Sequence, residues 1–143
     1  MSEQHNKAPF RIFQTMKHYD YTPDVINELA ENEIFVFGSN LQGMHGGGAA
    51  RYAYQHFGAV WGEGDGLYGK SYAIPTMHGG PEAIKPYVDK FIEFARQHDD
   101  MLFLVTPIGC GIAGFVPKDV APLFREAVGV ENIVLPKSFI EVL

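Results

Sequence analysis

The sequence has little of what membrane proteins and disulfide-bonded secreted proteins require. It contains a single cysteine among 143 residues, so no internal disulfide can form, which is typical of a reducing compartment. The longest apolar runs, 34–37 and 101–105, are too short to cross a bilayer, and the first residues lack the hydrophobic core of a signal peptide. We therefore expect a cytoplasmic protein with no membrane partner.

Positive charge is also scarce. Eleven Lys and Arg residues stand against 17 Asp and Glu, a net charge of -6. This disfavours a surface for duplex DNA, because such surfaces neutralise many phosphates with cationic side chains. One small anion held by backbone amides needs almost no net charge, so that class of ligand stays open.

Glycine, in contrast, is abundant, and the apolar pattern around it predicts one α/β domain over residues 1–143. Most of the 16 glycines lie between 38 and 80 and in 109–114. Residues 1–9 are polar and are expected to fray. For residues 25–30 we expect a short helix or a turn. The pattern indicates a central sheet covered on both faces. The predicted strands are 34–37, 72–76, 101–108 and 132–135, and the predicted helices are 49–57, 81–98 (beginning at Pro81 or Pro86) and 118–128.

Two glycine-rich loops, 38–48 and 109–115, each join a predicted strand to a predicted helix. In parallel α/β sheets, ligand sites lie beyond the carboxyl ends of the strands. Glycines allow the backbone to approach a ligand closely, and a helix N-terminus adds about half a positive charge. Two such loops on neighbouring strands predict a clamp for a diphosphate. The alternative is that the glycines only form tight turns.

The spacing Gly-x-Gly-x-x-Gly at 109–114 follows a predicted strand and precedes a helix, as in dinucleotide-binding folds. The same spacing recurs at 64–69, so the pattern is weak in this chain. The next predicted strand is followed by Pro136 and Lys137, with no acidic residue for a ribose hydroxyl. A nucleotide- or NAD-binding enzyme that uses this loop is therefore an alternative, and it places phosphate on the same loop.

Five single residues carry candidate chemistry. The thiol pKa of Cys110 is lowered if loop amides face it, although a small packing residue is the favoured interpretation. Glu63 and Asp65 are either an acid–base pair or part of a solvated loop. Asn40 is either a turn former or a ligand contact, and His45 either meets the bound anion or is an exposed loop residue. The six histidines show no metal-binding spacing, so we expect no metal and no cofactor.

The motifs FVFGSN, HGGGAA, GLYGKSYAIPT and IGCGIAGF together resemble those of a bacterial and phage group of macrodomain-like proteins. The resemblance covers roughly residues 34–135. It implies a three-layer α/β/α sandwich with a mixed central sheet. It also implies ADP-ribose or a related nucleotide as ligand, either free or attached to a protein or nucleic acid.

Carried over residue by residue, the resemblance implies that Asn40 faces the distal ribose, with 46–49 beside it. The amides of 109–113 would bind the diphosphate, and Phe115 would lie against the distal ribose. The implied ligand-binding residues are Gly38, Ser39, Asn40, Gly46, Gly47, Gly48, Ala49, Gly109, Cys110, Gly111, Ile112, Ala113, Gly114 and Phe115.

The catalytic residues of the hydrolytic macrodomain branches are missing. Ala50 occupies the position at which one branch has its catalytic acid. In a second branch, the positions of Ala113 and Met77 carry an acid and a lysine. Residues 52–55 lack the glutamates of a third branch. Binding is therefore better supported than hydrolysis, and a non-catalytic sensor module is the alternative to an ADP-ribosyl hydrolase. For hydrolysis, the candidate proton-transfer residues are His45, Glu63 and Asp65.

Overall fold

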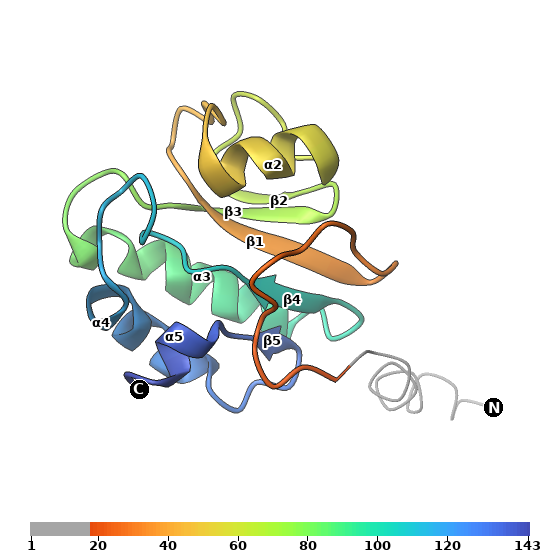
Figure 1. The fold of residues 1–143 in the computed structure, drawn as a ribbon, viewed down its shortest axis with the longest axis vertical. Coiled ribbons are helices and arrows are strands. Elements are labelled where there is room, and N and C mark those ends of the chain that lie inside the picture. Colours follow the sequence, from red (N-terminus) through yellow and green to blue (C-terminus); the bar gives the residue numbers. More distant parts are fainter. Residues whose placement is uncertain (1–17) are drawn as a thin grey trace.

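A computed structural model describes residues 18–143 and shows an α/β fold around one mixed sheet (Figure 1). The five strands follow the order β2-β3-β1-β4-β5, in which β2 is antiparallel to β3 and the other pairs are parallel. The predicted α/β class is confirmed. The strands are β1 (Glu33–Ser39), β2 (Gly66–Tyr68), β3 (Ser71–Pro75), β4 (Leu102–Val105) and β5 (Ile133–Val134).

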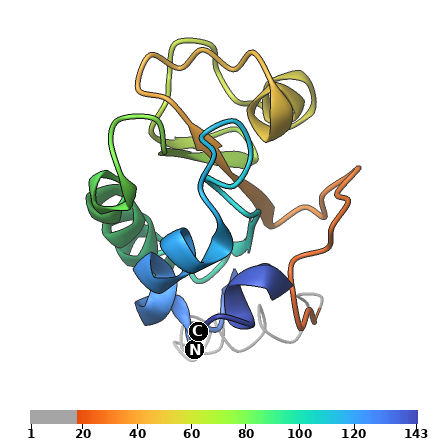
Figure 2. The same cartoon turned by 60° about the vertical axis from the view of Figure 1, so that its left-hand side comes forward.

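Helical segments lie on both faces of this sheet (Figures 1 and 2). One face packs against α2 and the other against α3 and η2. No helix within residues 18–143 is long and apolar enough to cross a membrane. The α-helices are α2 (Gly48–His56), α3 (Lys85–Arg96), α4 (Pro117–Val120) and α5 (Lys137–Ile140), and the 3-10 helices are η1 (Pro81–Ala83) and η2 (Ala121–Ala127).

Strand β1 is buried on both faces, as its continuous apolar run predicts. Side chains alternate along a strand, so Ile34 and Val36 face the α3 side while Phe35 and Phe37 face α2. On the α2 side, Ala50 and Ala53 are among the buried residues of α2, and their small size lets the helix lie close to the sheet. This packing places the start of α2 at the carboxyl end of β1.

Several elements differ from the sequence prediction. The single helix predicted over 118–128 divides into α4 and η2, since Pro122 has no N–H to continue the α-helical bonds. The strand β2 and the helix α5 were not predicted, and 25–30 form no helix. Pro86 lies in the first turn of α3, where a missing N–H costs nothing. The frayed segment expected over 1–9 lies outside the described residues.

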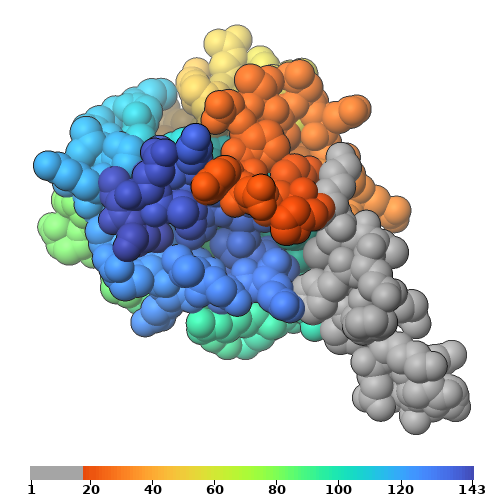
Figure 3. Space-filling view, turned by 60° about the horizontal axis from the view of Figure 1, so that its bottom comes forward, coloured from red at the N-terminus to blue at the C-terminus, as the bar shows by residue number. Residues whose placement is uncertain are grey.

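An irregular segment, 19–30, which we call the strap, covers the remaining part of the α2-side face. Its start is bonded to the C-terminal region, since Thr22 donates from its backbone N to Leu135 O at 3.0 Å and from Oγ1 to Val134 O at 3.0 Å. Its two ends are held by the buried Glu33 carboxylate, which accepts from Tyr19 Oη at 2.6 Å and from Ala30 N at 2.8 Å. Figure 3 shows the strap beside the C-terminal segment.

Tyr72 on β3 makes stability depend on pH in the alkaline range. Burial raises its pKa from the ordinary value of 10.0 to about 12, and the negative charge of Asp65 adds to the shift. The folded state therefore keeps a proton that the unfolded state has lost. Stability is fully present below pH 10 and is lost as the pH rises through about 12.

We expect the free energy of unfolding to fall between pH 10 and 12, by at most about 1.4 kcal/mol per pH unit from this group. Urea titrations across this range measure it. Tyr72→Phe should reduce the slope and leave the contribution of Tyr19, whose pKa is also raised to about 12 by burial and its bond to Glu33, while Tyr54→Phe, which alters an exposed ring, serves as the control. Identical slopes in all three proteins would contradict the assignment to Tyr72.

Candidate ligand-binding site

The carboxyl ends of β1, β3 and β4 meet at a cavity of about 350 Å³. β1 lies between β3 and β4, and the chain leaves β1 toward α2 on one face and β4 toward α4 on the other. Loops that diverge in this way leave a crevice between them. The cavity is lined by Gly38, Ser39, Asn40, Met44, Gly47, Gly48, Ala49, Ala50, Thr76, Met77, Thr106, Pro107, Ile108, Gly109, Cys110, Gly111, Ile112 and Ala113.

The two glycine-rich loops approach each other closely at the base of this cavity. A Cβ on Gly38 would lie 3.3 Å from the backbone N of Gly109 and 3.3 Å from the side chain of Thr76. Gly109 itself has a φ of +76°, a conformation that residues with side chains rarely adopt. Glycine at these two positions is therefore required by the close approach and the turn.

The first turn of α2 presents to the cavity backbone donors that find no acceptor among residues 18–143. Gly47 is the N-cap and has no side chain to accept from them, and the first turn contains no acidic residue. The amides of Gly48, Ala49 and Ala50 precede the first intrahelical bond, in which Arg51 N donates to Gly47 O. This end of the helix therefore carries partial positive charge that faces the ligand space.

The second loop offers a further set of donors. Its turn is closed by Phe115 N, which donates to Gly109 O at 2.8 Å, and by Gly114 N, which donates to Gly111 O at 3.0 Å. The amides of 111–113 find no backbone acceptor in the part of the chain that the structure describes. Both loops thus supply free N–H groups to one cavity, which is the geometry that binds phosphate oxygens.

The polar side chains of the cavity wall are already engaged within the protein. Thr106 Oγ1 donates to Val36 O at 2.7 Å, and Ser39 Oγ donates to Gly64 O. Asn40 bonds to Met44 in both directions, because Oδ1 accepts from its N at 2.9 Å and Nδ2 donates to its O at 3.1 Å. None of the lining residues is Asp, Glu, His, Lys or Arg. Backbone amides are therefore the main groups available to a ligand.

The residues after β3 and β4 also belong to the wall, which the sequence analysis missed. Thr76 and Thr106 each directly follow the residue that ends a strand. Their position after a strand could have identified them as wall residues, because every parallel strand contributes its carboxyl end to the same edge of the sheet.

Ile112 joins the two loops across the cavity. Its side chain is 72% exposed, and a Cβ on Gly47 would lie 3.0 Å from its Cδ1. The side chain therefore reaches from the 109–115 loop to the start of α2. A ligand held by both loops would lie next to this contact.

A second cavity, of about 390 Å³, adjoins the first. The two share Gly48, Ala49, Thr106 and Pro107 as lining residues. The rest of the second cavity comes from strap residues 22–27 together with Phe35, Tyr52 and Pro136. No sequence motif predicts that the strap lines a cavity, because its position depends on the hydrogen bonds from Thr22 to residues 134 and 135.

Three residues of the predicted binding set do not line the first cavity. Gly46 and Gly114 lie outside its wall. Phe115 packs against the α3-side core, and a Cβ on Gly109 would lie 3.3 Å from its ring. The resemblance placed Phe115 against the distal ribose, whereas in the structure its ring lies on the core side of the loop.

His45 is buried, with 1% of its surface exposed, and does not line the cavity. Its Nε2 lies 3.0 Å from Val60 O and 3.1 Å from Glu63 O, so it donates to these carbonyls. Its ring meets Phe37 edge-on, with centroids 5.5 Å apart. The structure therefore gives His45 a role in packing rather than the ligand contact or the exposed position considered from sequence.

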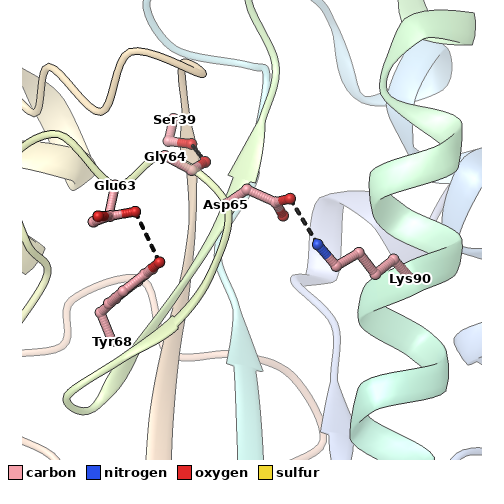
Figure 4. A network of polar contacts seen from close by, with 6 residues as sticks. All are labelled: Ser39, Glu63, Gly64, Asp65, Tyr68 and Lys90. Atoms are coloured by element: carbon pink, nitrogen blue, oxygen red, sulfur yellow. Dashed lines mark hydrogen bonds and ion pairs between the residues drawn. The ribbon is translucent and has the colours of Figure 1, made fainter.

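Glu63 and Asp65 do not come together as an acid–base pair. Glu63 accepts from Tyr68 Oη at 2.9 Å, and Asp65 forms an ion pair with Lys90 Nζ at 2.7 Å. Figure 4 shows the two carboxylates directed to opposite sides of the segment that carries them. Neither lines the cavity.

Cys110 lines the cavity, but its surroundings do not activate it. Burial raises the pKa of the thiol, and the negative charge of Asp119 raises it further. The side chain also packs against the α3-side core. The structure thus favours the packing interpretation over a reactive thiolate.

The dinucleotide-fingerprint interpretation of 109–114 requires a free helix N-terminus after the loop. The following helix, α4, has four residues, and the Asp119 carboxylate accepts from Val116 N at 3.3 Å. This helix start is thus occupied by an acidic side chain, which disfavours a phosphate there. The start of α2 has no such competitor.

Comparison of the chain with protein-family models, with curated proteins and with solved structures gave no match.

Proposed function

We propose that this protein binds ADP-ribose, or a closely related nucleotide diphosphate, between the two glycine-rich loops. The observation that carries the proposal is the convergence of two sets of unpaired amides, at the start of α2 and in 111–113, on one cavity without charged side chains. Such a site holds an anion by oriented N–H groups, which agrees with the net charge of -6.

The two adjoining cavities favour a ligand longer than a mononucleotide. With the diphosphate between the loops, one end of the ligand extends past Gly48 and Thr106 into the second cavity. There the rings of Phe35 and Tyr52 offer apolar contact to a base, and Asp24 offers hydrogen-bond acceptors. The other end extends toward Asn40, where the terminal ribose would lie.

The same arrangement supports a macrodomain-like sandwich as the fold. The sheet has a parallel centre with an antiparallel edge strand, and helices cover both faces. The two loops that carry the resemblance in sequence flank one site. Both features are those that the resemblance implies.

We propose binding without turnover. Hydrolysis of an ADP-ribosyl bond needs a group that takes a proton from the attacking water. Among the residues that line the first cavity, where the terminal ribose would lie, only Cys110 has an ionisable side chain, and its pKa is raised. A sensor or interaction module is therefore favoured over a hydrolase.

A thermal-shift and calorimetric comparison of ADP-ribose, NAD, AMP and inorganic phosphate tests the ligand class. We expect ADP-ribose to stabilise the fold more than AMP does, since AMP cannot engage both loops and both cavities at once. At about 100 times its dissociation constant, ADP-ribose should add roughly 2.7 kcal/mol to the free energy of unfolding. Equal stabilisation by AMP and ADP-ribose would contradict a clamp for a diphosphate.

A further inference from the structure

One buried carboxylate closes the strap into a loop. Glu33, which is 2% exposed, accepts from Tyr19 Oη at 2.6 Å on one oxygen and from Ala30 N at 2.8 Å on the other. The two residues that it joins are the first and the last of the strap. We call this pair of hydrogen bonds the clasp. Irregular surface segments of this length whose ends are held together are Ω-loops, which are frequently functional.

A second charged side chain, Lys70, holds the same end of the strap from the turn before β3. Its Nζ donates to Leu29 O at 3.2 Å and to Ala30 O at 2.6 Å. The peptide unit between Leu29 and Ala30 therefore accepts from an ammonium group and donates to the Glu33 carboxylate. Hydrogen bonds to charged groups are stronger than those between neutral groups, so this end of the strap is held firmly.

The middle of the strap forms the wall of the second cavity but has few bonds of its own. Residues 22–27 line that cavity. From 23 to 28, no backbone group pairs with another backbone group of residues 18–143. Ile26 and Leu29 add apolar contacts to the core of the sheet. The shape of this wall therefore depends on the bonds that fix the two ends of the strap.

The three side chains that hold the strap do not meet a ligand themselves. Tyr19, Glu33 and Lys70 line neither cavity, so any effect on a ligand passes through the strap. Burial and the bond to Glu33 raise the pKa of Tyr19 to about 12, so its hydroxyl keeps the proton that it donates. Burying a carboxylate is costly, and hydrogen bonds offset that cost only in part. Glu33 is therefore better explained by the strap conformation that it selects than by added stability.

Building on the proposed ADP-ribose binding, we propose that Glu33, together with Tyr19 and Lys70, positions the strap as a preformed wall of the second cavity and so sets the preference for ligands that carry a base. With the clasp closed, residues 22–27 are ordered before the ligand arrives. With the clasp open, the ligand has to order them, and the lost conformational entropy lowers its affinity. Only ligands that reach the second cavity bear this cost.

The test measures the affinities of ADP-ribose, AMP and ribose 5-phosphate by calorimetry. Ribose 5-phosphate has no base and reaches the first cavity only. We expect Glu33→Ala and Lys70→Met to weaken ADP-ribose and AMP about tenfold, since ordering a single residue costs about this factor, and to leave ribose 5-phosphate unchanged. Tyr19→Phe, which removes one hydroxyl and keeps the ring, should weaken the same two ligands less. Glu33→Gln keeps an acceptor for Ala30 N and should retain most of the affinity.

Hydrogen exchange gives a readout that needs no ligand. In Glu33→Ala and Lys70→Met, the amides of the strap should exchange faster while those of the sheet stay protected, and the control Glu31→Ala, which alters an exposed carboxylate, should change neither exchange nor affinity. Equal weakening of ADP-ribose and ribose 5-phosphate would overturn the inference, as would unchanged strap exchange or unchanged ADP-ribose affinity in the folded variants. Failure of the unaltered protein to bind ADP-ribose would instead overturn the proposed function itself.

Discussion

Gly47→Val is expected to eliminate most of the affinity for ADP-ribose while the protein stays folded. Gly47 lines the cavity at the start of α2, so the added methyl groups would stand where the diphosphate meets the helix amides. Overpacking of a filled site costs about 1–3 kcal/mol, which corresponds to roughly a fivefold to 150-fold loss of affinity.

The backbone at this position accepts a side chain. Gly47 has φ −155° and ψ 166°, in the extended region that valine favours. The closest atom to its Cβ would be Cδ1 of Ile112 at 3.0 Å, the end of an exposed side chain that can move aside. We therefore expect a melting temperature close to that of the unaltered protein.

Gly46→Val is the matched control. It adds the same side chain one residue earlier, where a Cβ would meet nothing within 4 Å and which does not line the cavity. Gly111→Val repeats the test on the other loop, since its Cβ also meets nothing within 4 Å. Calorimetric titration with ADP-ribose measures all three. Equal affinity in Gly46→Val and Gly47→Val, both folded, would move the ligand away from this cavity.

The architecture could be predicted in outline because its strands have strong local signals. Residues 34–37 and 102–105 are buried on both faces, and their continuous apolar runs predict strands without any tertiary information. Strand β2 has three half-buried residues, the first of which is Gly66, and only its pairing with β3 makes it a strand. Helix α5 has four residues, too few for a periodic pattern.

The placement of the site could be predicted from the same strands, but its wall could not be predicted in full. Loops after neighbouring parallel strands must meet, which is why 38–48 and 109–115 converge. The part played by Asn40 depends on bonds to Met44 that no spacing reveals. The second cavity depends on the strap, which is placed by long-range bonds from Thr22 to 134–135.

His45→Ala is expected to lower the free energy of unfolding by roughly 3 kcal/mol, as large-to-small substitutions in a core do. The ring is 1% exposed and packs against Phe37, Tyr54 and Trp61. Its removal leaves a cavity and also takes the donor from the carbonyls of Val60 and Glu63. The surface rings of Tyr54 and Trp61 should lose their support at the same time.

Two variants separate packing from chemistry. His45→Phe keeps an aromatic ring but supplies no donor, so it should recover part of the stability lost in His45→Ala. His56→Ala, which alters an exposed histidine of α2, should change the free energy of unfolding by less than about 0.5 kcal/mol. Urea unfolding measures all of these proteins, and ADP-ribose titration is done well below their transitions. In a packing role, the variants lose stability but keep their affinity for ADP-ribose as long as they are folded. Lost turnover of an ADP-ribosylated substrate, with stability and binding unchanged in His45→Ala, would instead make this buried ring a participant in catalysis.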